Sequence, residues 1–107
     1  MAERFDLNFE GDRLFWVLEK LELAARHLEA ENAPILWRLE QALLEMHAVW
    51  PRDLPIDLHE QFDPIRGALR AGGSLVMTDW EAEIVVQAIL KLRGEVEGLI
   101  DQQRRPQ

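Results

Sequence analysis

The sequence has 107 residues, of which 48% are hydrophobic and 30% charged, with 12 basic and 20 acidic side chains, a formal net charge of −8 and no cysteine. A chain of this length and composition forms one domain around a single modest core and is unlike a disordered chain. Its acidity disfavours direct binding to DNA or RNA, and the lack of cysteine excludes disulfides, thiolate metal sites and iron–sulfur clusters.

The N-terminal segment MAERFDLNFEGDR carries acidic side chains and lacks the basic and apolar regions of a signal peptide. No uninterrupted apolar run approaches the ~20 residues that a membrane-spanning helix needs. We therefore expect a cytoplasmic protein that does not bind membranes.

The first predicted elements are a short arm and a long helix. Residues 4–9 alternate apolar and polar side chains, which predicts an extended arm that Gly11 ends. Asp12 is expected to cap the helix that follows, which runs to about residue 30. The apolar face of this helix consists of Leu14, Val17, Leu18, Leu21, Ala24, Ala25 and Leu28.

A second helix is predicted from Asn32 to about Trp50. Asn32 can cap its exposed amides, and Pro34 fits only the first turn of a helix. The short turn after the first helix makes the two helices an antiparallel hairpin. The inner face consists of Ile35, Leu39, Ala42, Leu43, Met46, Val49 and Trp50.

A third, shorter helix is predicted over residues 57–70. Pro51 and Pro55 place an extended connection before it, and Pro64 is expected to kink the helix or make it restart. Its inward side chains are Leu58, Phe62, Ile65 and Leu69.

The fourth helix begins at a specific signal. Thr78 and Glu81 have the spacing of a capping box, so a helix is predicted from Asp79 to about residue 102, after a brief extended stretch over 75–77. Gly94 and Gly98 are expected on its solvent side. Its apolar stripe consists of Ile84, Val85, Ala88, Ile89, Leu92, Val96, Leu99 and Ile100, with Val86 and Leu90 outside it.

These elements predict an all-α, single-domain bundle of about four helices with a short extended N-terminal arm. The bundle is expected over residues 1–103, with a disordered tail over 104–107.

Several helices carry more apolar surface than one core needs. Trp16 and Leu23 lie roughly opposite the core face of the first helix, and Trp37 and Leu44 repeat that spacing on the second. Val86 and Leu90 add to this surface on the fourth helix. Either the arm and the proline-rich connection cover these side chains, or they face another chain.

The richest polar segment is RDLPIDLHEQFD, residues 52–63. It lacks the glycine and the alternating oxygen ligands of a calcium loop, and a solvated connection explains it. Arg52 and Asp53, followed six residues later by His59, resemble the Arg-polar-x-His signature of HEPN-type RNases, which are small helical proteins. That family carries the motif on a helix, whereas Pro55 interrupts a helix here, and the acidic surface suits RNA poorly.

No metal or cofactor site is predicted. His27 and Glu31 have helical i, i+4 spacing, but a third ligand would have to come from His47 or elsewhere. A single His–Glu pair at this spacing is typical of side chains that interact electrostatically on a helix surface. The sequence also contains no P-loop, no dinucleotide fingerprint and no nucleophile elbow.

We therefore predict a non-enzymatic protein-interaction module that binds a protein partner and forms a homodimer or a larger oligomer. One alternative is an acidic inhibitor, antitoxin-like or phage-encoded, that blocks a basic nucleic-acid-binding protein. Another is a weak hydrolase or HEPN-like RNase that uses residues 52–63. The predicted interface consists of Trp16, Leu23, Trp37, Leu44, Val86 and Leu90.

Overall fold

The computed structural model describes residues 2–30, 32–71 and 76–104, and the side chains of residues 12–30, 32–71 and 76–103. Within these residues there are four α-helices and two short 3₁₀ helices but no strand, which confirms the predicted all-α fold. The elements in chain order are α1 (Ala2–Leu28), α2 (Ile35–Met46), η1 (Pro51–Asp53), η2 (Ile56–Leu58), α3 (His59–Arg70) and α4 (Asp79–Arg104).

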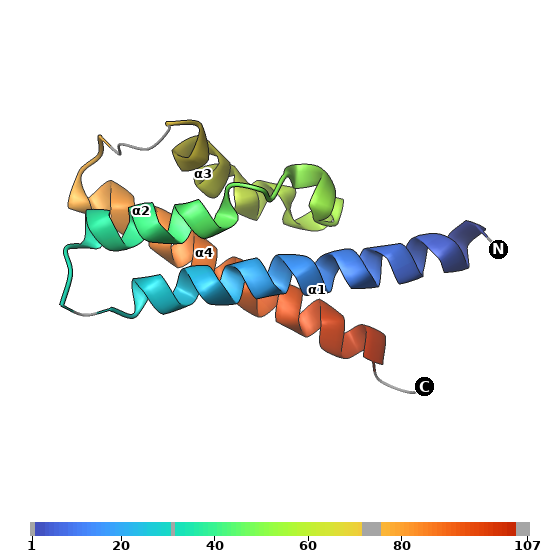
Figure 1. The fold of residues 1–107 in the computed structure, drawn as a ribbon. Coiled ribbons are helices and arrows are strands. Elements are labelled where there is room, and N and C mark those ends of the chain that lie inside the picture. The colour runs from blue at the N-terminus through green and yellow to red at the C-terminus, as the bar shows by residue number, and fades with distance from the viewer. Residues whose placement is uncertain (1, 31, 72–75, 105–107) are drawn as a thin grey trace.

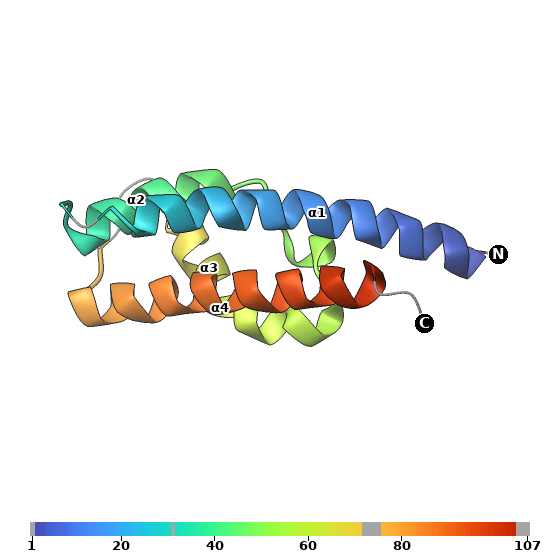
Figure 2. The same ribbon diagram turned by 90° about the horizontal axis from the view of Figure 1, so that it is seen from below.

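The helices form an elongated bundle with extents of 48 × 24 × 18 Å (Figure 1). The first two helices run antiparallel, and α4 contacts each of the other three (Figures 1 and 2). One continuous core fills the space between them. Its largest fully buried side chains are Leu21, Leu39, Met46, Phe62, Ile65, Ile89 and Leu92.

The N-terminal arm is helical, so the prediction of an extended segment over residues 4–9 is wrong. The backbone of these residues forms the first turns of α1, and Asp12 lies inside the helix instead of capping it. A helix satisfies its own backbone hydrogen bonds, whereas a strand needs a partner, and the described residues offer none. Gly11 costs a helix only about 1 kcal/mol, which is too little to end it.

The start of α2 also differs from the prediction. Pro34 occupies the cap position, where no side chain bonds to the exposed amides, so Asn32 does not cap this helix. Arg38 holds the turn instead, because its Nη1 donates to the Leu28 carbonyl at 2.8 Å and its Nε to the Ala33 carbonyl at 2.9 Å. One arginine thereby joins the end of α1 to the start of α2.

α2 ends at Met46, four residues before the predicted end at Trp50. Pro51 disfavours a helical backbone at the residue before it, and Trp50 is extended, with φ −118° and ψ 159°.

Pro64 does not interrupt α3, which continues through it without restarting. Pro64 is exposed, so water can bond to the carbonyl that has lost its donor in the helix.

The start of α4 confirms the predicted capping box. The Thr78 N–H donates to Glu81 Oε1 at 2.9 Å, and the Glu81 N–H donates to Thr78 Oγ1 at 3.1 Å. The Thr78 N–H favours the ionised Glu81 side chain, and together with the Thr78 side chain it lowers the pKa of this carboxyl group. α4 ends at Arg104, while the rest of the predicted tail, residues 105–107, lies outside the described residues.

The core side of α4 is rotated from the predicted stripe. Ala82 and Val86 are buried, whereas Ile84 remains 43% exposed. Three helices, α1, α2 and α3, all pack on α4. They therefore bury a wider part of its circumference than a single neighbouring helix would. Gly94 and Gly98 lie on the exposed side, as predicted.

Candidate interaction surface

The outer face of α2 carries two large apolar side chains in contact with solvent. Trp37 is 49% exposed and Leu44 is 61% exposed. They lie seven residues apart on the side of the helix opposite its buried residues. The predicted second apolar face of this helix is therefore present, and about half of its apolar surface is open to solvent. The buried side consists of Leu39, Ala42, Leu43 and Met46.

The corresponding residues of α1 are less accessible. Trp16 is partly buried and packs against the core. Arg13 Cζ and Lys20 Nζ each lie 5.9 Å from the centroid of its ring, so two cations cover part of its surface. Leu23 is also partly buried. On α1, therefore, only part of the surface of Trp16 and Leu23 is accessible to a partner.

Val86 and Leu90 do not form an outer face. Val86 is 6% exposed and belongs to the core, and Leu90 is partly buried against it. Their position outside a narrow stripe suggested a second surface, but the arc of α4 that three helices cover includes them. Burial in their own chain leaves these side chains little area for a partner.

The sequence pattern missed an apolar pair at the start of α4. Trp80 is 74% exposed and Ile84 is 43% exposed, four residues apart on one side of the helix. Asp79, Glu81 and Glu83 lie next to them in the chain and are exposed as well. The i, i+4 spacing of Trp80 and Ile84 is a signal in the sequence, but the predicted core stripe includes Ile84.

Two polar side chains of the segment 52–63, Asp53 and His59, make structural contacts. Asp53 is buried, accepts a hydrogen bond from the Trp50 N–H at 2.8 Å and pairs with Arg13 Nη1 at 3.2 Å. His59 Nε2 donates to the Leu54 carbonyl at 2.9 Å. The two residues that a hydrolytic site would use therefore stabilise the connection between α2 and α3 and anchor it to α1.

The predicted pairing of His27 with Glu31 lies partly outside the described residues, because Glu31 is not among them. His27 Nε2 instead lies 3.4 Å from Glu45 Oε1, across the contact between α1 and α2. The described side chains include no group of three or more His, Cys, Asp or Glu residues placed to hold a metal ion. Within the same part of the chain, no helix is both long and apolar enough to cross a bilayer.

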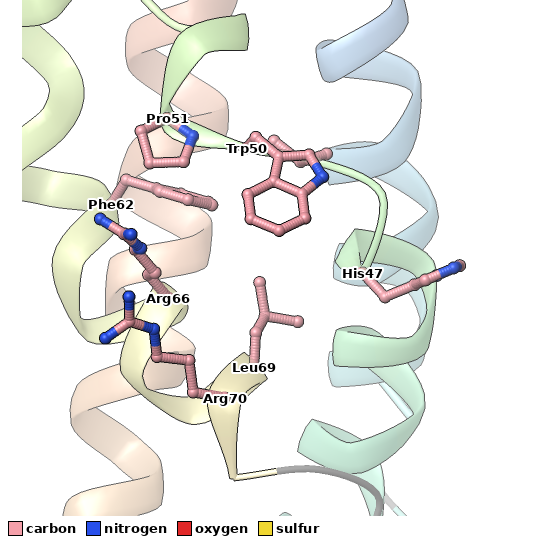
Figure 3. A pocket seen from close by; sticks show the side chains of 8 residues that line it. His47, Trp50, Pro51, Phe62, Arg66, Leu69 and Arg70 are labelled. Atoms are coloured by element: carbon pink, nitrogen blue, oxygen red, sulfur yellow. The ribbon is translucent and has the colours of Figure 1, made fainter.

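A pocket opens beside the connection, between the end of α2, η1 and α3 (Figure 3). Trp50 lies on one side of it, and Phe62, Arg66 and Arg70 project from α3 on the other, with Leu69 between them. Trp50 is 54% exposed, and Arg52 Cζ lies 6.0 Å from the centroid of its ring. No sequence pattern predicts this pocket, because it joins side chains from segments that no motif links.

The chain was compared with protein-family models, with curated proteins and with solved structures, and it matches none of them. Its function is therefore inferred from its own surface.

Proposed function

We propose that this protein is a protein-binding module that self-associates through the outer face of α2. The observation that supports this function is the exposure of Trp37 and Leu44 on one face of a helix whose opposite face is buried. A tryptophan and a leucine at helical spacing form a compact apolar patch, and tryptophan is enriched where binding energy concentrates. The proposed interface is centred on these two residues, with Trp16 and Leu23 at its edge.

The energetics favour a symmetric pair of copies. Fully burying an exposed large apolar side chain contributes about 2 to 3 kcal/mol at ~25 cal/mol per Å², and a half-exposed one contributes a corresponding part of that. In a twofold interface the same residues of both copies are buried, so two exposed residues per chain place four apolar side chains in the interface. That gain opposes the entropy lost on association, which is the main cost of forming a dimer.

Sedimentation equilibrium across a concentration series tests this proposal. The wild type is expected to form dimers, and Trp37→Ser with Leu44→Ser is expected to sediment as a monomer. Trp37 is about half exposed, Leu44 is mostly exposed, and neither belongs to the buried core, so the double variant should keep the helical content of a folded monomer. Added salt should leave the apolar interface intact, because screening weakens charge pairs and not apolar contacts.

The matched control is Trp80→Ser with Ile84→Ser, which removes an apolar pair of similar chemistry from α4. This variant is expected to dimerise like the wild type. A wild type that remains monomeric at every concentration, or a control that dissociates as fully as the α2 variant, would contradict the proposed interface.

A second candidate function is inhibition of a basic partner, which a hollow on α1 favours. Asp12, Glu19 and Glu22 line this hollow of about 510 Å³ together with apolar side chains. Carboxylates around an apolar floor suit a partner that presents lysine or arginine. A monomeric wild type that retains a basic nucleic-acid-binding protein in low salt and releases it in moderate salt would favour this candidate over self-association.

A further inference from the structure

The pocket between α2, η1 and α3 has a volume of about 430 Å³, which lies within the range of small-molecule sites. Its apolar part includes Val49, Phe62 and Leu69, and the exposed ring of Trp50 forms one wall. Figure 3 shows this ring facing the side chains of α3 across the opening. The pocket is therefore bounded by a flat aromatic surface and an apolar floor, a combination that suits a compact apolar body.

The charge of the pocket is opposite to that of the whole chain. Arg66 and Arg70 line it, and no acidic side chain does, although acids outnumber bases 20 to 12 in the sequence. Neither arginine forms an ion pair or a side-chain hydrogen bond with the described residues. They lie four residues apart on α3, where two like charges repel each other. The structure thus holds two guanidinium groups at this pocket, neither with an ion-pair partner among the described residues.

His47 also lines the pocket, but its ring does not add to the group formed by the two arginines. Its Nδ1 donates to the Leu44 carbonyl at 2.9 Å, and Figure 3 shows its ring directed away from the arginines. Arg52 lies near the opposite wall, with its Cζ 6.0 Å from the Trp50 ring centroid. The positive charge around the pocket therefore comes from arginine, whose planar fork matches the two oxygens of a carboxylate.

We propose that this pocket binds a small organic carboxylate with a flat apolar body. The apolar body packs between Trp50 and Leu69, and the carboxylate accepts hydrogen bonds from Arg66 and Arg70. Binding removes apolar surface from water and relieves the repulsion between the two arginines, so both parts of the ligand contribute. This site does not depend on the outer face of α2, so binding is expected to persist in the Trp37→Ser, Leu44→Ser variant.

The test uses naphthoate as a probe and two matched compounds. Naphthamide has the same body without the charge, and acetate has the charge without the body. Binding is followed by proton–nitrogen correlation spectra through the indole N–H signal of Trp50, which is assigned as the signal absent from Trp50→Phe. Naphthoate is expected to shift this signal saturably, and the two other compounds are expected to bind at least about tenfold more weakly.

The variant Arg66→Gln with Arg70→Gln is expected to weaken naphthoate binding by about tenfold or more, while leaving the weak binding of naphthamide unchanged. Arg66 is partly exposed and Arg70 exposed, so the variant should fold normally, which its melting curve will verify. The control is Arg26→Gln, an exposed arginine of α1 outside the pocket, and it should bind naphthoate as the wild type does. Equal binding of naphthoate and naphthamide, an unchanged affinity in the double arginine variant, or no saturable shift at millimolar naphthoate would each overturn the proposal.

Discussion

α2 and α4 both carry more apolar residues than a helix with one buried side requires, but the structure uses them in different ways. In α4 the extra residue Val86 widens a single buried arc, because three helices pack on this element. In α2 the extra residues Trp37 and Leu44 form a separate patch opposite the buried side. The number of apolar residues on a helix therefore does not show where they lie. A surplus can adjoin the buried arc, as Val86 does, or lie across the helix from it, as Trp37 and Leu44 do.

The sharpest test of this difference is Val86→Asp against Ile84→Asp. Val86 is 6% exposed and Ile84 is 43% exposed, although they are two residues apart. A carboxylate at position 86 would be buried without a partner, so we expect a loss of at least about 3 kcal/mol in the free energy of unfolding. The same change at position 84 should cost less than about 1 kcal/mol. Chemical denaturation measures both, and equal losses would show that the core side of α4 has been misassigned.

On α2 the matching experiment is Leu39→Ala against Leu44→Ala. Leu39 is fully buried, so its truncation leaves a cavity and should cost about 3 kcal/mol in the free energy of unfolding. Leu44 is 61% exposed, and its truncation should leave the stability of the monomer within about 0.5 kcal/mol. Urea denaturation at low protein concentration separates monomer stability from self-association. A large loss from Leu44→Ala under those conditions would mean that its own chain covers this side chain.

A smaller effect is expected where α4 begins. Thr78→Ala removes the acceptor for the Glu81 N–H and should destabilise the fold by about 1 kcal/mol. Thermal melting at neutral pH measures the loss, and Thr78→Ser is the matched control because it keeps the hydroxyl group. A Thr78→Ala melting curve identical to that of the wild type would indicate that these exposed bonds do not stabilise the helix.

The same capping box predicts the direction of a pH effect. The pKa of Glu81 is lowered in the folded chain, so the ionised form stabilises the fold. This stabilisation is complete above the pKa of an unfolded glutamate, about 4.3, and is lost as the pH falls through the lower pKa of the folded state. In Glu81→Gln this part of the acid sensitivity should disappear. Melting temperatures of the two proteins that decline in parallel below that pH would contradict the assignment.

The smallest expected change is a gain from Gly94→Ala and Gly98→Ala on the exposed side of α4. A Cβ atom at either position would meet no atom within 4 Å, so alanine adds helix propensity without a clash. Each substitution should stabilise the fold by about 0.5 to 1 kcal/mol, which a rise in melting temperature will show. A loss of self-association in either variant would mean that a partner approaches this side of α4 and not the outer face of α2.

The sequence was sufficient for some features that depend on local signals, although the caps predicted at Asp12 and Asn32 were wrong. The capping box at Thr78 and the exposed glycines of α4 were both predicted, because spacing along one helix determines them. The extended arm was predicted wrongly because three alternating apolar residues cannot show whether a partner strand exists. The rotation of α4 toward Val86 depends on how many helices pack on it, and the pocket at Trp50 depends on where the connection meets α3. Both are tertiary properties that no single segment encodes.

The contact between Arg13 and Asp53 affects how the molecule opens. Asp53 holds the Trp50 amide at 2.8 Å and also pairs with α1 at 3.2 Å, so the short connection after α2 is tied to a helix distant in the sequence. Detaching the connection from α1 would break this ion pair and expose the buried side chains of Leu54 and Leu58, which is costly. We therefore expect hydrogen exchange of the Trp50 amide to be slowed by the contact with α1. In kinetic terms, we expect the connection to open together with the first helix and not to fray independently.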